Sequence, residues 1–157
     1  MTDEAELKKA RFYALKVSNL RPRSVEELRE KLRDKGFAQE VIDGVVSEFA
    51  KKGILNDSKF SKLWVESRMA SNPKGAFLLR RELKEKGVKD EVIDQAIKES
   101  AGEHSEYEVV KTLAESRMAA LKGLDAAATK RRLFGYLRRR GFAVETIMRV
   151  MNEIGVK

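Results

Sequence analysis

Leucines and glycines recur along this chain in one arrangement that appears three times. Two leucines lie four positions apart, a glycine follows four positions later, and an apolar residue comes next. The copies are Leu28-Leu32-Gly36-Phe37, Leu79-Leu83-Gly87-Val88 and Leu133-Leu137-Gly141-Phe142, which begin 51 and 54 residues apart. A spacing of four is the spacing of an amphipathic helix, and a pattern that returns at a nearly fixed interval indicates a tandem repeat.

Apolar residues elsewhere also recur at intervals of three and four, with no period-two alternation. The pattern predicts an all-α protein with three helices in each repeat. The predicted helices lie near 4–19, 24–35 and 39–52, near 57–71, 75–86 and 90–101, and near 105–122, 127–140 and 144–154. Because about 50 residues bury a marginal core, we expect three helix-turn-helix-like repeats, 1–54, 55–102 and 103–157, stacked in an elongated, curved array.

Several residues indicate where these helices begin and end. Ser24-Val25-Glu26-Glu27 and Ser105-Glu106-Tyr107-Glu108 have the sequence of a capping box, and Asp57 and Asp90 are predicted N-caps. The predicted helix stops are Gly36, Gly53, Gly87, Gly102, Gly141 and Gly155, because glycine enters the left-handed conformation that closes a last helical turn.

The helical phase also predicts which side chains are buried. The predicted core comprises Phe12, Leu15, Leu28, Leu32, Phe37, Ile42 and Val46 in the first repeat, and Phe60, Leu63, Trp64, Leu79, Leu83, Val88, Ile93 and Ile97 in the second. Trp64 has the chemistry of a base-stacking residue. Its phase with Phe60 and Leu63 favours a place in the core instead.

The composition argues against an enzyme. The chain of 157 residues has no cysteine and one histidine, His104, which lies in a predicted linker. A thiol nucleophile and a thiolate metal site are therefore excluded. Asn72-Pro73-Lys74-Gly75 is a turn and not a phosphate-binding loop. We expect no catalytic residue, metal or cofactor. No apolar run reaches the roughly 20 residues of a membrane span or forms a signal-peptide core, so we also expect a cytoplasmic protein.

The charge is positive and unevenly distributed. The formal net charge is +8, and residues 106–157 hold 11 basic and 6 acidic side chains. No acidic residue occurs between Ala126 and Val144. On the predicted helix 127–140, Arg131 and Arg138 share one row, and Arg132 and Arg139 share a second. Two arginine rows without an intervening carboxylate suit a phosphate backbone or an acidic protein groove, although a merely solvated face is the alternative.

Basic residues recur on the equivalent helix of the other two repeats. In those copies Glu30, Asp34, Glu82 and Glu85 interleave with them, so an ordinary ion-paired face is at least as good an interpretation. The candidate residues for contact with DNA or a protein filament are Lys130, Arg131, Arg132, Arg138, Arg139, Arg140, Arg80, Arg81, Lys84, Lys86 and Arg68.

Three segments resemble a known family. Gly53-Ile54-Leu55-Asn56-Asp57, followed by Phe60, Trp64 and Arg68, resembles the most characteristic segment of the RecX regulatory proteins of bacteria. Arg21-Pro22-Arg23-Ser24 with Glu27-Leu28 resembles the segment before it, and Gly75, Leu79, Glu82-Leu83 and Lys86-Gly87-Val88 resemble the segment after it. The resemblance extends from Ala10 to Ile154 and is looser in the third repeat. Asn56 departs from the pattern, because aspartate is common there.

The resemblance implies three tandem three-helix units and a partner, the RecA recombinase. Members of the family bind within the groove of the RecA–DNA filament, inhibit ATP hydrolysis and strand exchange in DNA repair and the SOS response, and bind DNA with low sequence selectivity. We expect a monomer. Two alternatives stay open: a stand-alone helix-turn-helix regulator, which predicts a defined duplex site and a dimer, and a scaffold without salt-dependent nucleic-acid binding.

Overall fold

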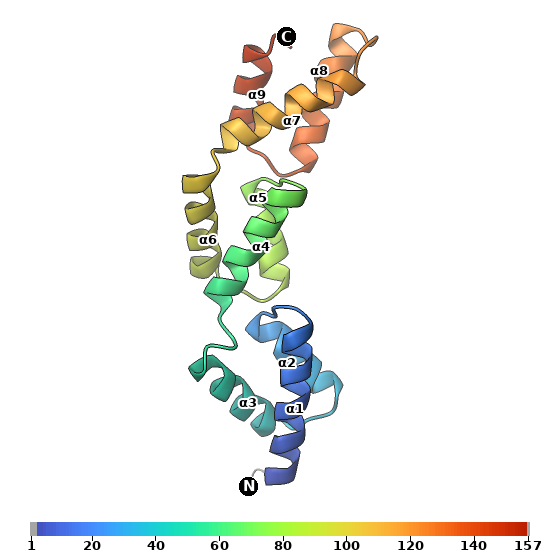
Figure 1. Cartoon of the computed structure of the whole chain (residues 1–157). Coiled ribbons are helices and arrows are strands. Elements are labelled where there is room, and N and C mark those ends of the chain that lie inside the picture. Colours follow the sequence, from blue (N-terminus) through green and yellow to red (C-terminus); the bar gives the residue numbers. More distant parts are fainter. Residues whose placement is uncertain (1–2, 157) are drawn as a thin grey trace. The chain divides into compact units, whose positions relative to one another are not determined.

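The computed structural model describes residues 3–156, which form nine helices and no strand (Figure 1). The helices are α1 Glu4–Leu20, α2 Val25–Asp34, α3 Gln39–Lys51, α4 Asp57–Ser71, α5 Ala76–Glu85, α6 Asp90–Glu103, α7 Glu106–Ala120, α8 Ala126–Arg139 and α9 Val144–Glu153. Their ends differ from the predicted ones by at most two residues. The all-α prediction with three helices per repeat is confirmed.

The helices pack into two compact units. The first comprises the described residues up to Leu63 together with Leu83–Ile93, and the second comprises Trp64–Glu82 together with the described residues from Asp94 onward. The middle repeat therefore contributes residues to both units. Each unit holds one complete repeat, α1 to α3 in the first and α7 to α9 in the second.

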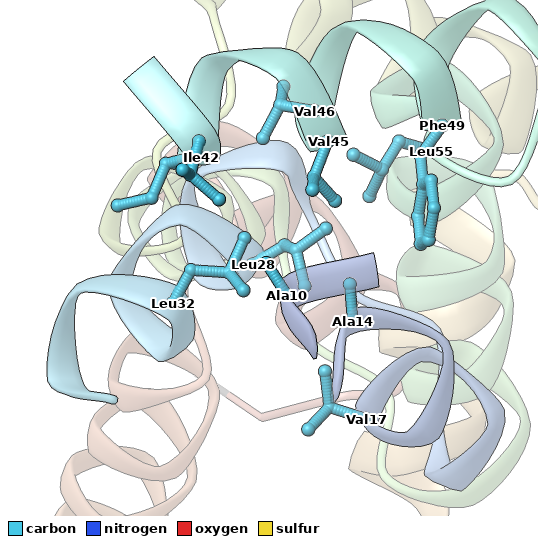
Figure 2. Packing of buried hydrophobic residues seen from close by; sticks show 11 residues of the cluster. Ala10, Ala14, Val17, Leu28, Leu32, Ile42, Val45, Val46, Phe49 and Leu55 are labelled. Carbon is cyan, nitrogen blue, oxygen red and sulfur yellow. The ribbon is translucent and has the colours of Figure 1, made fainter. Parts of the chain in front are cut away.

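The first repeat closes around a core in which small residues line one helix. Ala10, Ala14 and Val17 of α1 lie against large apolar side chains of α2 and α3, which are Leu28, Leu32, Ile42, Val45, Val46 and Phe49 (Figure 2). The prediction that Phe12 and Leu15 are buried was wrong, because their side chains are 74% and 39% exposed. The two alanines let the backbone of α1 approach its neighbours, and this turns the larger side chains towards solvent.

The third repeat repeats this design. Val110 and Ala114 of α7 are fully buried against Leu133 and Leu137 of α8. From α9 and its flanking turns, the same core includes Phe142, Ile147, Val150, Met151 and Val156. The leucines of the repeated motif are therefore core residues, as their spacing predicts.

Helix α4 presents a different face from the predicted one. Phe60 is 4% exposed as predicted, but Leu63 is 42% exposed and Trp64 is only half-buried. Ser61 and Val65 complete the buried face at 0% and 1%. The prediction of a core position was wrong for Leu63 and incomplete for Trp64, whose ring makes polar contacts described below.

The repeated glycines end helices as expected. Gly36, Gly87 and Gly141 have φ of 87°, 78° and 87°, a conformation that residues with a Cβ rarely adopt. Gly102 does not act in this way, because it lies inside α6, which continues to Glu103. The prediction of a stop at Gly102 was therefore wrong.

One capping box is confirmed and the other is not. The Ser24 hydroxyl accepts from the amide of Glu27 at 3.1 Å, and Glu27 Oε1 accepts from the amide of Ser24 at 3.1 Å. The side chain of Ser105 makes no such bond. Its neighbour Glu106 instead accepts from the amide of Ala143 at 2.9 Å and so caps the start of α9. The bond observed near this position therefore serves the start of α9 and not that of α7.

The two predicted aspartate caps are also displaced. Asn56 Oδ1 accepts from the amide of Lys59 at 3.0 Å and caps α4. The Asp57 carboxylate accepts from the amide of Val25 at 2.9 Å, which satisfies the first turn of α2. Asp90 is the first residue of α6 and forms an ion pair with Lys84, with 3.4 Å between Oδ1 and Nζ.

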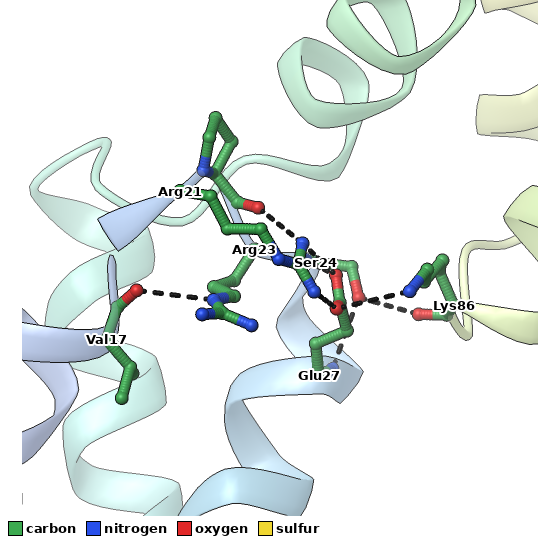
Figure 3. A network of polar contacts seen from close by, with 7 residues as sticks. Val17, Arg21, Arg23, Ser24, Glu27 and Lys86 are labelled. Atoms are coloured by element: carbon green, nitrogen blue, oxygen red, sulfur yellow. Dashed lines mark hydrogen bonds and ion pairs between the residues drawn. The ribbon is translucent and has the colours of Figure 1, made fainter. Parts of the chain in front are cut away.

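Consecutive repeats meet through the same pair of positions. The Ser24 hydroxyl donates to the carbonyl of Lys86 at 2.6 Å (Figure 3). Gly75, at the position of Ser24 in the next repeat, donates its backbone N–H to the carbonyl of Arg140 at 2.7 Å. At each junction, the residue before the turn glycine of one repeat is thus hydrogen-bonded to the start of the middle helix of the preceding repeat. The first junction lies within the first unit and the second within the second unit.

Candidate nucleic-acid interface

The orientation of α8 is determined by its start and by its buried face. The Asp125 side chain caps the helix by accepting from the amide of Ala128 at 2.7 Å. Leu133 and Leu137 are completely buried, and Thr129 is 8% exposed. Because these residues lie on one side of the helix, the residues at opposite phase face solvent.

That outer side carries the basic residues. Lys130, Arg131, Arg132, Arg138 and Arg139 are exposed, and we call them the α8 basic face. Arg138 Nη1 donates to the carbonyl of Phe142 at 2.8 Å. The Arg139 guanidinium folds back over Gly135, where an added Cβ would lie 2.9 Å from Nη1.

The α8 basic face is not neutralised within the described part of the chain. None of its five side chains forms an ion pair there, in contrast to Arg149 of α9, whose Nε lies 3.5 Å from Glu153 Oε1. Uncompensated arginines retain their attraction for anions, and their planar guanidinium groups match phosphate and carboxylate oxygens in pairs. The face is therefore suited to binding an extended anion.

Other kinds of site find less support. The described residues contain no group of three or more histidine, cysteine, aspartate or glutamate side chains arranged to hold a metal ion. Within the same residues, no helix combines the length and apolar character required to cross a membrane.

Comparisons with known proteins decide the family. Models of the first, second and third RecX three-helix domains match residues 10–49, 56–97 and 104–151. A regulatory protein RecX from Amycolatopsis mediterranei (strain U-32) is 37% identical over 139 residues, which are 88% of this chain and 79% of that protein. The chain belongs to the RecX family. A RecX from Prosthecochloris aestuarii (strain DSM 271 / SK 413) is 30% identical over 151 residues, 96% of this chain and 97% of that one.

The RecX fold extends over nearly all of the described chain. A crystal structure of RecX from Lactobacillus salivarius superimposes with a TM-score of 0.86, covers 98% of this chain and 99% of its own, and is 19% identical. At that identity the likeness shows the fold alone.

In this RecX-family chain, Arg140 is part of a repeat junction. Its guanidinium carbon lies 4.7 Å from the ring centre of Tyr136, and Nη1 donates to Asn72 and, at 3.3 Å, to the carbonyl of Pro73. Arg117 covers the same ring at 4.9 Å. The predicted candidate Arg140 thus fastens the third repeat to the turn before α5.

The candidates of the middle repeat are mostly paired with carboxylates. Arg80 pairs with Asp94, Lys84 with Asp90 at 3.4 Å, Lys86 with Glu27 at 3.4 Å, and Arg68 with Glu82 at 3.1 Å. Arg81 is exposed on α5. The sequence left two interpretations open for this helix, and the observed geometry is that of an ion-paired face.

A polar cluster around Glu82 was not anticipated from the sequence. Its carboxylate accepts from Trp64 Nε1 at 2.8 Å, from Arg68 Nε at 3.1 Å and from Lys74 Nζ. Arg68 also stacks on Trp64, 4.6 Å from the ring centre. Burial alone would raise the pKa of Glu82, but hydrogen bonds from Lys74 and Trp64 and the charge of Arg68 outweigh it and hold the pKa below its usual range. The only feature of the sequence that indicates this cluster is the spacing of four between Trp64 and Arg68.

Proposed function

We propose that this chain is a non-enzymatic regulator of the RecA recombinase, which binds RecA and its DNA filament and inhibits ATP hydrolysis, filament growth and strand exchange. Membership of a family whose curated members are named regulatory protein RecX supports the regulatory role. The observation that carries the binding surface is the α8 basic face, whose five cations have no carboxylate partner in the described part of the chain.

Phosphate contact explains the expected low sequence selectivity. Arginines that bind phosphate oxygens release condensed counterions, which supplies affinity and makes it depend on salt. Such contacts position a protein on nucleic acid but do not read base identity. A surface of this kind, in a protein that also contacts RecA, would bind a filament at any DNA sequence.

The helix-turn-helix alternative has a specific weakness. In that mode the first turn of the second helix of the motif enters the major groove. In this chain the corresponding helices are α3, α6 and α9, and their first turns contain Glu40, Asp90 with Glu91, and Glu145. Negative charge at these positions repels phosphates, so the equivalent helices are poor recognition helices.

The proposal is tested by RecA ATP hydrolysis on single-stranded DNA with this protein added below the concentration of RecA. We expect ATP turnover to fall and filaments to shorten, since a filament regulator acts on many RecA subunits through few binding events. Unchanged turnover together with unchanged filament length would overturn the proposal.

A second measurement separates the alternative classes. Footprinting on duplex DNA without RecA is expected to show no preferred site. A discrete footprint on one sequence would identify a stand-alone DNA-binding regulator, and the absence of any salt-dependent nucleic-acid binding would identify a scaffold.

A further inference from the structure

A groove of about 240 Å³ lies within the first unit, between the end of α1 and the beginning of α4. Its lining includes the apolar residues Ile54, Phe60 and Leu63 and the basic residues Arg23 and Lys59. It is distinct from the α8 basic face, which belongs to the other unit.

Part of the apolar lining is open to solvent. Ile54 and Leu63 are each 42% exposed, whereas Phe60 is 4% exposed. Leu63 was expected in the core, yet the fold leaves it on the surface of this groove. Adjoining exposed aliphatic side chains with a polar edge are a common feature of protein-binding surfaces.

The charged side chains that line the groove, Arg23 and Lys59, are both basic. Arg23 Nε donates to the carbonyl of Val17 at 3.2 Å, and Figure 3 shows its guanidinium held there, away from Glu27. Neither Arg23 nor Lys59 forms an ion pair with a carboxylate in the described residues. Burial, and then the charge of Arg21, lower the pKa of Arg23 by more than the charges of Glu27 and Tyr13 raise it.

We propose that this groove binds a short acidic protein segment that carries one or two large aliphatic side chains. The aliphatic side chains pack on Ile54 and Leu63, and the flanking carboxylates pair with Arg23 and Lys59. A nucleic acid fits less well, because single strands bind through exposed aromatic rings and the one aromatic side chain in the groove, Phe60, is covered. This inference does not rest on the proposed function.

Fluorescence polarisation of the full chain with a labelled Asp-Glu-Leu-Leu-Glu-Asp peptide tests the groove. Replacing both peptide leucines by serine, or all four acids by lysine, is expected to abolish binding. Leu63→Glu should weaken it roughly tenfold, and Lys59→Glu about three- to tenfold. The control Leu124→Glu alters a 38%-exposed leucine of the other unit and should leave binding unchanged.

Three outcomes would overturn the inference: no saturable binding of the acidic peptide, equal binding by the two groove variants and the native chain, or displacement of the peptide by a single-stranded oligonucleotide. The last would assign the groove to nucleic acid. Helical circular dichroism shows whether each variant is folded. Replacement of the α8 arginines should leave peptide binding intact. Loss of peptide binding would therefore count against the groove alone, and an unchanged RecA ATPase would count against the proposed function alone.

Discussion

Gly75 and the turn glycine Gly141 are in such close contact that no side chain fits between them. An ideal Cβ on Gly75 would lie 2.1 Å from the Gly141 carbonyl oxygen and 2.5 Å from the amide nitrogen of Phe142. At the corresponding junction one repeat earlier, Ser24 has room for its side chain, and its hydroxyl group donates to the carbonyl of Lys86. The two junctions therefore join equivalent positions but differ in the donor, a side-chain hydroxyl in one and a backbone amide in the other.

Gly75→Ala is expected to destabilise the second unit. The methyl group would push against backbone atoms, which cannot rotate away, so overpacking should cost about 1–3 kcal/mol. Urea unfolding followed by circular dichroism measures the change. Gly102→Ala is the matched control, because Gly102 lies within α6 with nothing within 4 Å of an added Cβ, and it should instead stabilise the protein by about 0.5–1 kcal/mol. Equal effects of the two substitutions would contradict the packing argument.

Glu82→Gln should reduce stability by about 1–2 kcal/mol at neutral pH, because the charge-assisted bonds to Lys74 and Arg68 are lost. The folded-state pKa of Glu82 is lowered from its usual 4.5, so its contribution is complete above pH 4.5 and is lost as the pH falls through the lower folded-state value. In the Glu82→Gln variant, the free energy of unfolding should therefore lack this part of its dependence on pH. Urea unfolding at a series of pH values, read by the fluorescence of the single tryptophan, Trp64, tests this.

The exposed Glu30 provides the comparison, since it forms no ion pair within the described residues. Glu30→Gln should alter neither stability nor its acid dependence. If the Glu82 and Glu30 variants had the same pH profile, the cluster would not be the source of the effect.

Reversal of Arg131, Arg132, Arg138 and Arg139 to glutamate is expected to weaken DNA and filament binding with the helical circular dichroism unchanged. The corresponding glutamine variant avoids adding negative charge to the last turn of α8 and should still lose most of the affinity. If each arginine neutralises one phosphate, the slope of log affinity against log salt falls by about 0.7 for each contact with single-stranded DNA.

A charge-matched control removes four exposed lysines from the first unit, Lys8, Lys9, Lys16 and Lys51, by substitution with glutamine. It lowers the net charge by the same amount as the glutamine variant of α8. We expect a much smaller change in affinity and slope. Equal losses in both variants would show that overall charge, and not the α8 basic face, determines binding.

Arg140→Ala separates a structural arginine from the surface ones. Loss of its bonds to Asn72 and Pro73 and of its stacking on Tyr136 should lower the free energy of unfolding by about 1–3 kcal/mol. Arg140→Lys should restore little, because an ammonium group cannot reproduce the planar stacking. Arg131→Ala, by contrast, should stay within about 0.5 kcal/mol of the native protein. Thermal unfolding measures both, and similar melting temperatures for the Arg140 and Arg131 variants would refute the assignment.

Local interactions explain why much of the fold was predictable. The spacing of Leu28, Leu32 and Gly36 specifies a helix, its buried face and its end within nine residues of chain, and the same holds in each repeat. The Ser24 capping box involves residues three positions apart. Such features depend on neighbours in the sequence, which a single chain displays directly.

Errors occurred where a distant residue competed with a local one. The side chain of Ser105 makes no cap bond, while its neighbour Glu106 caps the distant α9, and Asp57 satisfies α2 instead of α4. The exposure of Phe12 was missed because Ala10 and Ala14 give α1 an inward face that carries little hydrophobic signal.

The sequence alone determined the helical repeat, the concentration of arginine on α8 and the family, since each depends on residue type and spacing. The tertiary structure decided which cations are available. Arg131 and Arg140 lie nine positions apart in one basic segment, yet one is exposed without a carboxylate partner in the described chain and the other is bound to Asn72 across 68 positions of sequence. Long-range pairing of this kind arises from how repeats dock, and no local pattern encodes it.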